Sequence, residues 1–231
     1  MPAVRRPRST SPALPLAAAQ QSGADKRERI LSAAEDLLYR NGMVGTTMDM
    51  LCAELGVTKP YVYYYFKDKQ EIVETLAWRA SLACLTTMKF PADDARPAAE
   101  KLAEGLQRWV AACVMHFRAS ALAFRVTASL RPEFRAELRA LADDFYADLV
   151  ALMEQGRRDG KLDFEDAAIT AKAMGGVVGF MYTWYRPEGR LAPEELVERL
   201  SATLRRMIGL HPQARIAATP RPRTPTRRKP S

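Results

Sequence analysis

Residues 46–66 restrict the fold of this chain more than any other stretch, because three local signals follow one another there. Thr46 and Thr47 precede a short run whose apolar residues recur at helical spacing, and either hydroxyl can cap the first free amides of a helix. Gly56 then breaks the pattern, and Thr58 stands where a second helix would begin, with a proline in its first turn. A short helix, a tight glycine turn and a capped second helix form a helix-turn-helix, which we therefore predict.

The second helix of this unit has an unusual composition, since the stretch TKPYVYYYFKDK, residues 58–69, holds four tyrosines. These are Tyr61, Tyr63, Tyr64 and Tyr65. Tyrosine, valine and phenylalanine favour β structure, and three of the tyrosines alternate as on one face of a strand. The order of the turn and capping signals outweighs that propensity and favours a helix. At about 100° per residue, Val62 and Phe66 share one side of this helix, so we expect them to anchor it in the core while the tyrosines project.

Helical periodicity continues through most of residues 23–210, and the part of this range that follows the helix-turn-helix domain shows no β signals or internal repeats. The first helix carries an apolar stripe from Ile30 to Leu38 that stops at Asn41 and Gly42. Later helices are predicted over residues 70–88, 98–118, 121–130, 132–158, 165–185 and 193–210. The expected fold is all-α: an N-terminal three-helix helix-turn-helix domain followed by a C-terminal helical bundle, about nine helices in total.

A longer segment, RERILSAAEDLLYRNGMVGTTMDMLCAELGVTKPYVYYYFKDKQEIV, resembles the DNA-binding domain of TetR-type transcriptional repressors. The shared features fall in order: the I-L-x-A-A opening, Gly42, the Thr-Thr pair, the Leu-Gly-Val turn, and Tyr-x-x-Phe before a lysine pair. The resemblance implies that the C-terminal domain dimerises through the last two long helices and binds an inducer inside the bundle. Many relatives have a small residue where this chain has Tyr61, so no base preference is carried over.

The resemblance also implies roles for individual residues at the DNA. In a helix-turn-helix the second helix lies in the major groove with its N-terminal residues at the base edges. Lys59 is expected to donate to guanine acceptors, and the ring of Tyr61 to pack on a thymine methyl. Tyr63, Tyr64 and Lys69 are expected to hold phosphates, with packing against the next domain as the alternative role of the tyrosines. The predicted DNA-binding set is Thr46, Thr47, Thr58, Lys59, Pro60, Tyr61, Tyr63, Tyr64, Tyr65 and Lys69.

Positive charge is concentrated at the ends of the chain. The formal net charge is +8, yet nine basic residues and no acids lie in residues 1–22 and 212–231, which leaves 26 basic against 27 acidic residues in between. Both ends are rich in proline, serine and threonine and are predicted to be disordered, either as solvated tails or as salt-sensitive phosphate contacts. Within residues 58–69 three lysines face one aspartate, a net charge of +2, so tight DNA binding requires two copies of the domain. The expected domains are a tail over 1–22, the DNA-binding domain over 23–83, the ligand-binding and dimerisation domain over 84–211, and a basic tail over 212–231.

An inducer site in the bundle needs apolar walls and a few polar groups that orient the ligand. The candidate lining is Trp109, Cys113, His116, Phe117, Phe124, Phe145, Leu149, Met181 and Trp184, with an ordinary place in the core as the alternative for each. His116 needs a hydrogen-bond partner, which either the protein or a ligand can supply. Residues 179–200 resemble a TetR subgroup associated with fatty-acid, steroid and aromatic-acid catabolism, which implies an acyl-CoA or another lipid or aromatic catabolite as inducer.

Small residues at Ala173, Gly176 and Gly179 lie along one part of the penultimate predicted helix. Small side chains let a second helix approach closely, so these residues are a candidate dimer seam, with close packing inside one subunit as the alternative. The predicted partners are thus an operator duplex, a second copy of the chain and a small-molecule inducer. A protein partner in place of the inducer is the competing possibility.

Motifs of catalysis are missing from the sequence. It contains two histidines, His116 and His211, and no G-x-S-x-G, P-loop, G-x-G-x-x-G or H-E-x-x-H, so we predict neither an enzyme nor a metal or cofactor site. Three widely spaced cysteines, Cys52, Cys84 and Cys113, indicate a reducing compartment. No apolar run approaches the roughly 20 residues of a membrane span. We therefore expect a cytoplasmic transcriptional regulator without a membrane partner.

Overall fold

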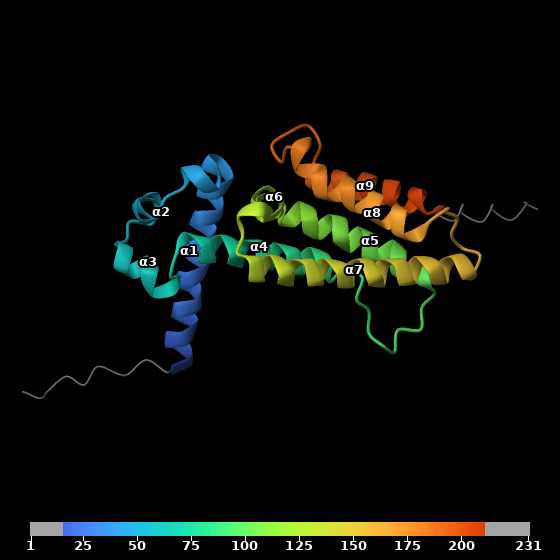
Figure 1. The fold of residues 1–231 in the computed structure, drawn as a ribbon, viewed down its shortest axis with the longest axis horizontal. Coiled ribbons are helices and arrows are strands. Elements are labelled where there is room, and N and C mark those ends of the chain that lie inside the picture. The colour runs from blue at the N-terminus through green and yellow to red at the C-terminus, as the bar shows by residue number, and fades with distance from the viewer. Residues whose placement is uncertain (1–15, 211–231) are drawn as a thin grey trace, which may run out of the picture.

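The computed structural model describes residues 16–210, and in that range every regular element is helical (Figure 1). The α-helices are α1 (Leu16–Gly45), α2 (Met48–Leu55), α3 (Lys59–Tyr65), α4 (Lys69–Leu85), α5 (Ala98–Met115), α6 (Phe117–Val126), α7 (Pro132–Arg158), α8 (Ala167–Gly179) and α9 (Pro193–Met207). Two short 3-10 helices are η1 (Thr127–Ser129) and η2 (Phe180–Thr183). The predicted all-α fold is therefore confirmed over the described residues.

The first helix begins at Leu16, earlier than the predicted start at residue 23. The residues that extend it are mainly alanines and glutamines, which are strong helix formers. The predictions for the C-terminal tail and for residues 1–15 fall outside the described part of the chain.

Local capping explains how α2 and α3 form. Thr47 precedes α2 and accepts a hydrogen bond from the amide of Met50 at 3.2 Å. Gly56 ends α2 with a φ of 65°, a left-handed conformation that glycine adopts without steric cost. Thr58 takes the N-cap position of α3 in an extended conformation, but its side chain makes no capping hydrogen bond, so α3 lacks the hydroxyl cap that we expected.

These helices form a head at one end of the molecule, and its core extends into the bundle (Figure 1). Leu122, Val126 and Leu130, on and just after α6, pack in the same buried cluster as the apolar faces of α1 to α4. The expected domain division at residues 83–84 lies near the end of α4. The first half of α4 belongs to the head core and its second half to the bundle core, so α4 and α6 both connect the two parts.

Polar contacts of Arg131 join the same two parts. The guanidinium of Arg131 pairs with Asp68 at 3.2 Å and with Glu74 at 3.1 Å, and its amide donates to Glu74 at 3.1 Å. Gln70 adds a hydrogen bond to the carbonyl of Ser129 at 2.9 Å. Because Glu74 is buried, its carboxyl oxygens need partners within the protein, and Arg131 supplies them; these contacts attach the segment after α6 to the start of α4. We call them the Arg131 link.

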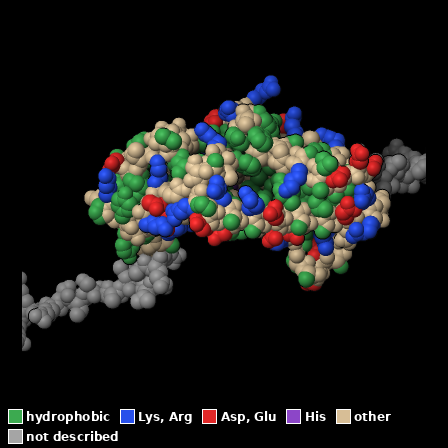
Figure 2. Space-filling model, viewed as in Figure 1, with side chains coloured by type: hydrophobic (Ala, Val, Ile, Leu, Met, Phe, Trp, Pro, Cys, Tyr) green, Lys and Arg blue, Asp and Glu red, His purple; other side chains and the backbone are tan. Residues whose placement is uncertain are grey.

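In the bundle, α5 packs against α4, α7 and α9, while α8 covers α7. Trp109 and Phe145 lie inside the bundle core with their ring centroids 4.7 Å apart. Acidic and basic side chains are interspersed over the visible face of the bundle (Figure 2). That distribution agrees with the near-neutral balance of the chain between its tails.

A sharp bend at His116 separates α5 from α6. The sequence predicted helices over residues 98–118 and 121–130, but α5 ends at Met115 and the chain turns by 84° into α6. Beyond the bend, the ring of Phe117 packs edge-on against Tyr39 and Tyr185, which fixes the start of α6 beside α1. Those contacts are long-range, so helical periodicity misplaced the break.

Three other predicted ends also differ from the structure. The helix expected over 70–88 is α4, Lys69–Leu85, and the one expected over 193–210 stops at Met207. The helix expected over 165–185 divides into α8 and η2. Among residues 16–210 no single helix is long and apolar enough to cross a membrane, and only α5 together with the bent α6–η1 segment meets that test.

Candidate nucleic-acid interface and bundle pocket

Helix α3 lies at the head end of the molecule (Figure 1), and two tyrosines on its outer face are exposed. Tyr64 is 82% exposed and Tyr63 is 46% exposed. Val62 and Phe66 point the other way and are buried in the head core. The predicted division of this helix into an anchoring side and a projecting side agrees with these positions.

Tyr61 and Tyr65 are half-buried and pack against the head core. The centroid of the Tyr65 ring lies 5.6 Å from that of Tyr61 and 5.0 Å from that of Tyr64. Such aromatic pairs contribute about 0.5–1.5 kcal/mol beyond their burial, so Tyr65 stiffens the outer face. Tyr61 consequently presents only part of its ring to a partner.

Lys59 begins α3 and forms an exposed ion pair with Asp49 of α2, with 2.8 Å between the ammonium and carboxylate atoms. Hydrogen bonding to Asp49 raises the pKa of Lys59, so the ammonium group stays charged at neutral pH. An exposed pair of this kind contributes little to stability. Lys59 can therefore exchange Asp49 for a base or a phosphate at small cost.

Two members of the predicted DNA-binding set point into the head instead. Thr46 is 3% exposed, and its hydroxyl is hydrogen-bonded to the carbonyls of Gly42 at 2.8 Å and Leu37 at 3.2 Å. The ammonium of Lys69 donates to the carbonyls of Met43 and Thr46, both at 2.7 Å. These carbonyls lie where α1 ends, and helix ends leave carbonyls without helical donors. We therefore reassign Thr46 and Lys69 from phosphate contacts to supports of the α1–α2 connection.

Thr47, Thr58 and Pro60 are exposed around the N-terminal ends of α2 and α3. The Thr47 oxygen accepts the Met50 amide, which leaves its hydroxyl hydrogen free to donate to an anion. The N-terminus of α2 adds the positive end of a helix dipole. We use the name recognition surface for the set Thr47, Thr58, Lys59, Pro60, Tyr61, Tyr63 and Tyr64.

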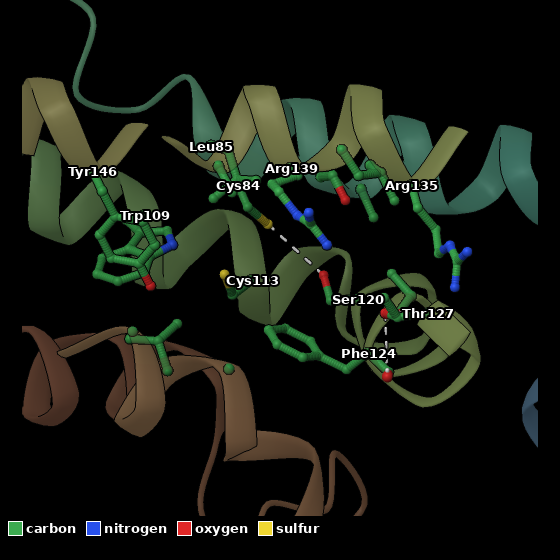
Figure 3. A pocket seen from close by; sticks show the side chains of 18 residues that line it. Cys84, Leu85, Trp109, Cys113, Ser120, Phe124, Thr127, Arg135, Arg139 and Tyr146 are labelled. Carbon is green, nitrogen blue, oxygen red and sulfur yellow. Dashed lines mark hydrogen bonds between the residues drawn. The ribbon is translucent and has the colours of Figure 1, made fainter. Parts of the chain in front are cut away.

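A pocket of about 400 Å³ lies inside the bundle, a volume suited to a small organic ligand. Its lining comes from α4 to α8 and from η1. The residues are Ala80, Ser81, Cys84, Leu85, Trp109, Cys113, Ser120, Ala123, Phe124, Thr127, Arg135, Leu138, Arg139, Ala142, Tyr146, Gly175, Val178 and Gly179. In Figure 3, Trp109 and Tyr146 lie at one end and Arg135 and Thr127 at the other, with Cys84, Cys113 and Ser120 between them.

The predicted pocket residues divide into three groups. Trp109, Cys113 and Phe124 line the pocket. Phe145, Leu149 and Met181 are buried in the bundle core and do not line it, so the alternative of an ordinary core position holds for them. The remaining members are Phe117, at the joint with α1, His116, at the bend, and Trp184, exposed beside a separate hollow near α9.

Sequence reasoning missed the polar side of the pocket. Arg135 and Arg139 line it from α7, one turn apart, and within residues 16–210 neither forms an ion pair. Ser120 and Tyr146 add hydroxyl groups. The spacing of these two arginines shows in the sequence that they share one face of a helix. Only the packing of α7 against α4 and α8 shows that this face borders a pocket.

Two glycines of α8 make room for aromatic rings that line the pocket. A Cβ atom on Gly179 would lie 2.6 Å from the Cζ atom of Phe124, and one on Gly175 would overlap the hydroxyl of Tyr146. Gly179 therefore packs inside the subunit, which is the alternative to the predicted dimer seam. Gly176 differs, because a Cβ atom there would meet nothing within 4 Å.

The opposite side of α8 is apolar and uncovered. Ile169, Ala173, Gly176, Val177 and Phe180 recur at helical spacing, and the three large side chains among them are exposed. We call these five residues the α8 outer face. Two of the three predicted seam residues, Ala173 and Gly176, belong to it.

These features define a class of protein: a helix-turn-helix head with an exposed recognition helix, attached through shared helices to a helical bundle that contains a pocket. Two family models match the chain in the same order. The model described as bacterial regulatory proteins, tetR family, matches residues 30–76, and the one described as tetracyclin repressor-like, C-terminal domain, matches residues 95–208. The chain belongs to the TetR family of transcriptional regulators.

Individual relatives agree with that assignment. The HTH-type transcriptional regulator EthR of Mycobacterium tuberculosis is 34% identical over 82 residues, which cover 34% of this chain and 38% of EthR. An uncharacterised regulator of Haemophilus influenzae is matched over 42% of its length, so the chain spans about two fifths of such relatives. The transcriptional repressor BepR of Brucella suis is 25% identical over 182 residues, which cover 71% of this chain and 83% of the length of BepR.

Solved structures share the whole fold. The TetR family regulator PfmR from Thermus thermophilus superposes with a TM-score of 0.69 at 25% identity, covering 77% of this chain and 97% of PfmR. AibR, solved in complex with isovaleryl coenzyme A and operator DNA, has a TM-score of 0.64 at 21% identity over 77% of this chain and 97% of its own. At that identity the AibR comparison concerns the fold alone.

Proposed function

We infer that this protein is a sequence-specific transcriptional regulator that binds operator DNA as a homodimer and represses until a small ligand releases it. The observation that carries the inference is the exposed row of Lys59, Tyr63 and Tyr64 on α3, with Val62 and Phe66 anchoring the helix behind it. Membership of a family of transcriptional regulators supports the same function.

In the proposed complex α3 lies in the major groove. Lys59 and the accessible part of Tyr61 face the base edges, where a lysine suits guanine and an apolar ring suits the thymine methyl. Tyr63, Tyr64 and Thr47 donate hydroxyl hydrogens to phosphates and set the position of the helix. Thr46 and Lys69 keep the α1–α2 connection rigid without contacting DNA.

The α8 outer face is the proposed dimer interface. A contiguous apolar surface on one helix is characteristic of an interaction site, whereas scattered exposed apolar residues are not. Two-fold pairing of this face would present two α3 helices to successive major grooves, about 34–36 Å apart, on a pseudo-palindromic operator. The second head compensates for the small positive charge of residues 58–69.

The pocket lining favours a ligand with an apolar body and an anionic group. Trp109, Phe124 and Leu138 offer apolar walls, while Arg135 and Arg139 offer two guanidinium groups without acidic partners in the described chain. Guanidinium pairs carboxylate and phosphate with good geometry. Acyl-CoA thioesters and other carboxylated lipid or aromatic catabolites fit this description, and AibR, which has the same fold, was solved with isovaleryl coenzyme A.

Helix α6 gives the ligand a route to the head. One side of α6 contributes Leu122 and Val126 to the head core, and another contributes Ser120, Ala123 and Phe124 to the pocket. A ligand that contacts Ser120 and Ala123 therefore acts on a helix that is part of the head core. A coupling of about 1–3 kcal/mol through α6 would weaken operator binding about 5- to 150-fold.

The alternative is a regulator that responds to a protein partner and has a filled bundle. A cavity of about 400 Å³ with unpaired arginines favours a ligand over that alternative. A thermal-shift screen of coenzyme A thioesters, free fatty acids and aromatic acids separates the two, because a ligand of the native state raises the melting temperature. A hit that depends on Arg135 and Arg139 supports the ligand, whereas no hit from any of these classes supports the protein partner.

Selection from random duplexes, followed by anisotropy titration at fixed salt, tests DNA binding. Lys59→Ala should weaken operator binding and lower the dependence on salt by about one unit if Lys59 reaches a phosphate, or relax sequence preference if it reaches a base. Lys89→Ala is the matched control, since Lys89 is as exposed as Lys59 and also pairs with an aspartate, at 3.3 Å. Equal affinities for the two variants would refute the placement of α3 at the DNA.

A further inference from the structure

Two cysteine side chains that the proposed function does not use lie in the wall of the bundle pocket. Cys84 comes from α4 and Cys113 from α5, and both belong to the pocket lining. The sulfur of Cys84 lies 3.8 Å from the hydroxyl oxygen of Ser120 on α6 (Figure 3). Three helices thus bring two thiols and a hydroxyl together at an apolar cavity large enough for a small organic molecule.

The two thiols differ in their readiness to ionise. A hydrogen bond with the Cys113 thiol lowers the pKa of Cys84, and the Ser120 hydroxyl lowers it further, although burial opposes both. The pKa of Cys113 is raised well above its usual value, because Cys113 hydrogen-bonds to Cys84 and is buried. The thiolate is the reactive form of cysteine, and the Ser120 hydroxyl lies 3.8 Å from the Cys84 sulfur, where it can donate to a thiolate, so we assign Cys84 as the nucleophile of the pair.

Cys52 provides a contrast within the same chain. It is buried in the head core and lines none of the pockets described above. Burial raises the pKa of Cys52, with Asp49 adding to the effect. The two side chains are about equally buried, at 7% exposed for Cys52 and 5% for Cys84, so they differ in that only Cys84 borders the cavity and has the Ser120 hydroxyl beside its sulfur.

We propose that Cys84 is a site of covalent modification by apolar α,β-unsaturated carbonyl compounds that enter the bundle pocket. Such compounds need an apolar cavity for their body and a thiolate beside their double bond. Trp109, Phe124 and Tyr146 supply aromatic walls, and Cys84 supplies the nucleophile between them. A soft carbon electrophile is also the class of reagent that a thiolate attacks without help from a metal or cofactor.

The reaction is a conjugate addition that needs no further reactant. The sulfur of Cys84 forms a bond to the β-carbon, and the carbon–carbon π bond breaks. The electron pair of that π bond moves through the α-carbon to the carbonyl oxygen, which gives an enolate. The proton that Cys84 gave up then returns to the α-carbon. The product is a thioether with the full mass of the reagent added, and nothing is oxidised or reduced.

The position of Ser120 ties this chemistry to regulation. An adduct on Cys84 occupies the space in front of Ser120, on the helix that also carries Leu122 and Val126 in the head core. The adduct would therefore act on the head as the reversible ligand does. This regulatory consequence rests on the proposed function, whereas the addition itself rests only on the pocket.

The test treats the full-length reduced protein with benzylideneacetone, an aromatic unsaturated ketone, and follows adducts by intact mass and peptide mapping. Benzylacetone, which has the same skeleton without the double bond, is the matched control reagent. We expect one adduct, on Cys84, forming before any adduct on Cys52, because only Cys84 lines the pocket and its pKa is lowered whereas that of Cys52 is raised. Benzylacetone should leave no adduct.

Variants of the three cysteines and of Ser120 show which side chains determine the rate of adduct formation. Cys84→Ser should abolish the fast adduct, and Ser120→Ala should slow it by removing one donor to the sulfur. Cys113→Ala should slow it as well, whereas Cys113→Ser, which keeps a donor, should restore most of the rate. Cys52→Ser should leave the rate at Cys84 unchanged, and a circular dichroism melt of each variant establishes that it is folded.

Three outcomes overturn the inference: equal rates at Cys84 and Cys52, a first adduct on Cys113, or labelling of Cys84 only in denaturant. Measuring operator binding tests the regulatory effect of the adduct separately from the formation of the adduct. If the reversible ligand releases DNA but the Cys84 adduct does not, the regulatory part fails and the proposed function stands. If Lys59→Ala and Lys89→Ala bind DNA equally, the proposed function fails while the adduct on Cys84 remains a valid result.

Discussion

The recognition surface and the bundle pocket are assembled in different ways. The recognition surface comes mostly from consecutive residues 58–64, together with Thr47, on two short helices. The pocket draws its lining from five helices, α4 to α8, over residues 80–179. An exposed side chain of this surface, such as Tyr64, can therefore change with little effect on its neighbours, whereas a side chain at the pocket is coupled to helices far away in sequence.

The difference matters because the two regions share structural elements. Helices α4 and α6 each contribute to the head core and to the pocket. The Arg131 link attaches the segment that follows α6 to the start of α4. Substitutions of Lys59, Tyr63 and Tyr64 should affect mainly DNA binding, whereas Thr47 also caps α2 and Tyr61 also packs against the head core. Substitutions at the pocket or the link should affect stability and communication between the two parts.

The largest expected effect separates the two sides of α3. Phe66→Ala should lower the free energy of unfolding by about 3–5 kcal/mol, because it removes a large side chain from the head core. Tyr63→Ala on the outer face is the control and should change stability by less than about 0.5 kcal/mol. Urea unfolding monitored by circular dichroism measures both, and similar losses would mean that α3 has no distinct outer face.

The Arg131 link should rank next. Arg131→Ala leaves the buried carboxylate of Glu74 without its main partner and should cost about 1–3 kcal/mol. Arg199→Ala, which breaks a solvent-exposed pair with Glu195, should cost no more than about 0.5 kcal/mol. If the two variants unfold at the same urea concentration, the link contributes nothing to joining the head and the bundle.

The packing of α8 on the pocket should have a smaller effect. Gly179→Ala places a methyl group against the end of the half-exposed Phe124 ring, which can turn aside, so the variant should cost at most about 1 kcal/mol. Gly23→Ala, in α1, meets nothing within 4 Å and should be neutral or stabilising by up to about 1 kcal/mol, since alanine favours a helix. Thermal unfolding compares the two, and the reverse order would show that Gly179 does not face the pocket.

The last expected effect, of about that size or smaller, concerns one hydroxyl group on the recognition surface. Tyr64→Phe should weaken operator binding by about 1 kcal/mol, or about fivefold in Kd, without changing stability, because it removes a phosphate donor. Tyr182→Phe, at a half-buried tyrosine of the bundle, is the control and should leave Kd unchanged. Unaltered affinity in Tyr64→Phe would restrict Tyr64 to packing against DNA sugars or to no contact.

The recognition surface was largely predictable because its signals are local. The Thr47 cap, the Gly56 turn and the anchoring of Val62 and Phe66 all follow from capping rules and helical periodicity, and the structure has them where expected. Thr46 and Lys69 were the exceptions. Lys69 reaches carbonyls 23 and 26 positions away, and no pattern in a single sequence indicates such a contact.

The pocket was predictable only in outline. Aromatic residues at helical spacing indicated an apolar interior, and three of the nine candidates line the cavity. An apolar side chain follows the same pattern whether it faces a filled core or a cavity, so Phe145 and Leu149 could not be distinguished from Trp109. The break between α5 and α6 and the turn of Arg135 and Arg139 toward the cavity depend on helix packing, which periodicity does not encode.

The sequence alone determined the helix-turn-helix, the all-α class and the two sides of α3, because each depends on residues within a few turns of one another. Tertiary structure decided which polar groups stay free for DNA, where the pocket opens, and that Cys84, Cys113 and Ser120 meet. The physical reason is that hydrogen bonds and cavities form wherever helices from distant parts of the chain approach, and the approach is set by the packing of the whole core.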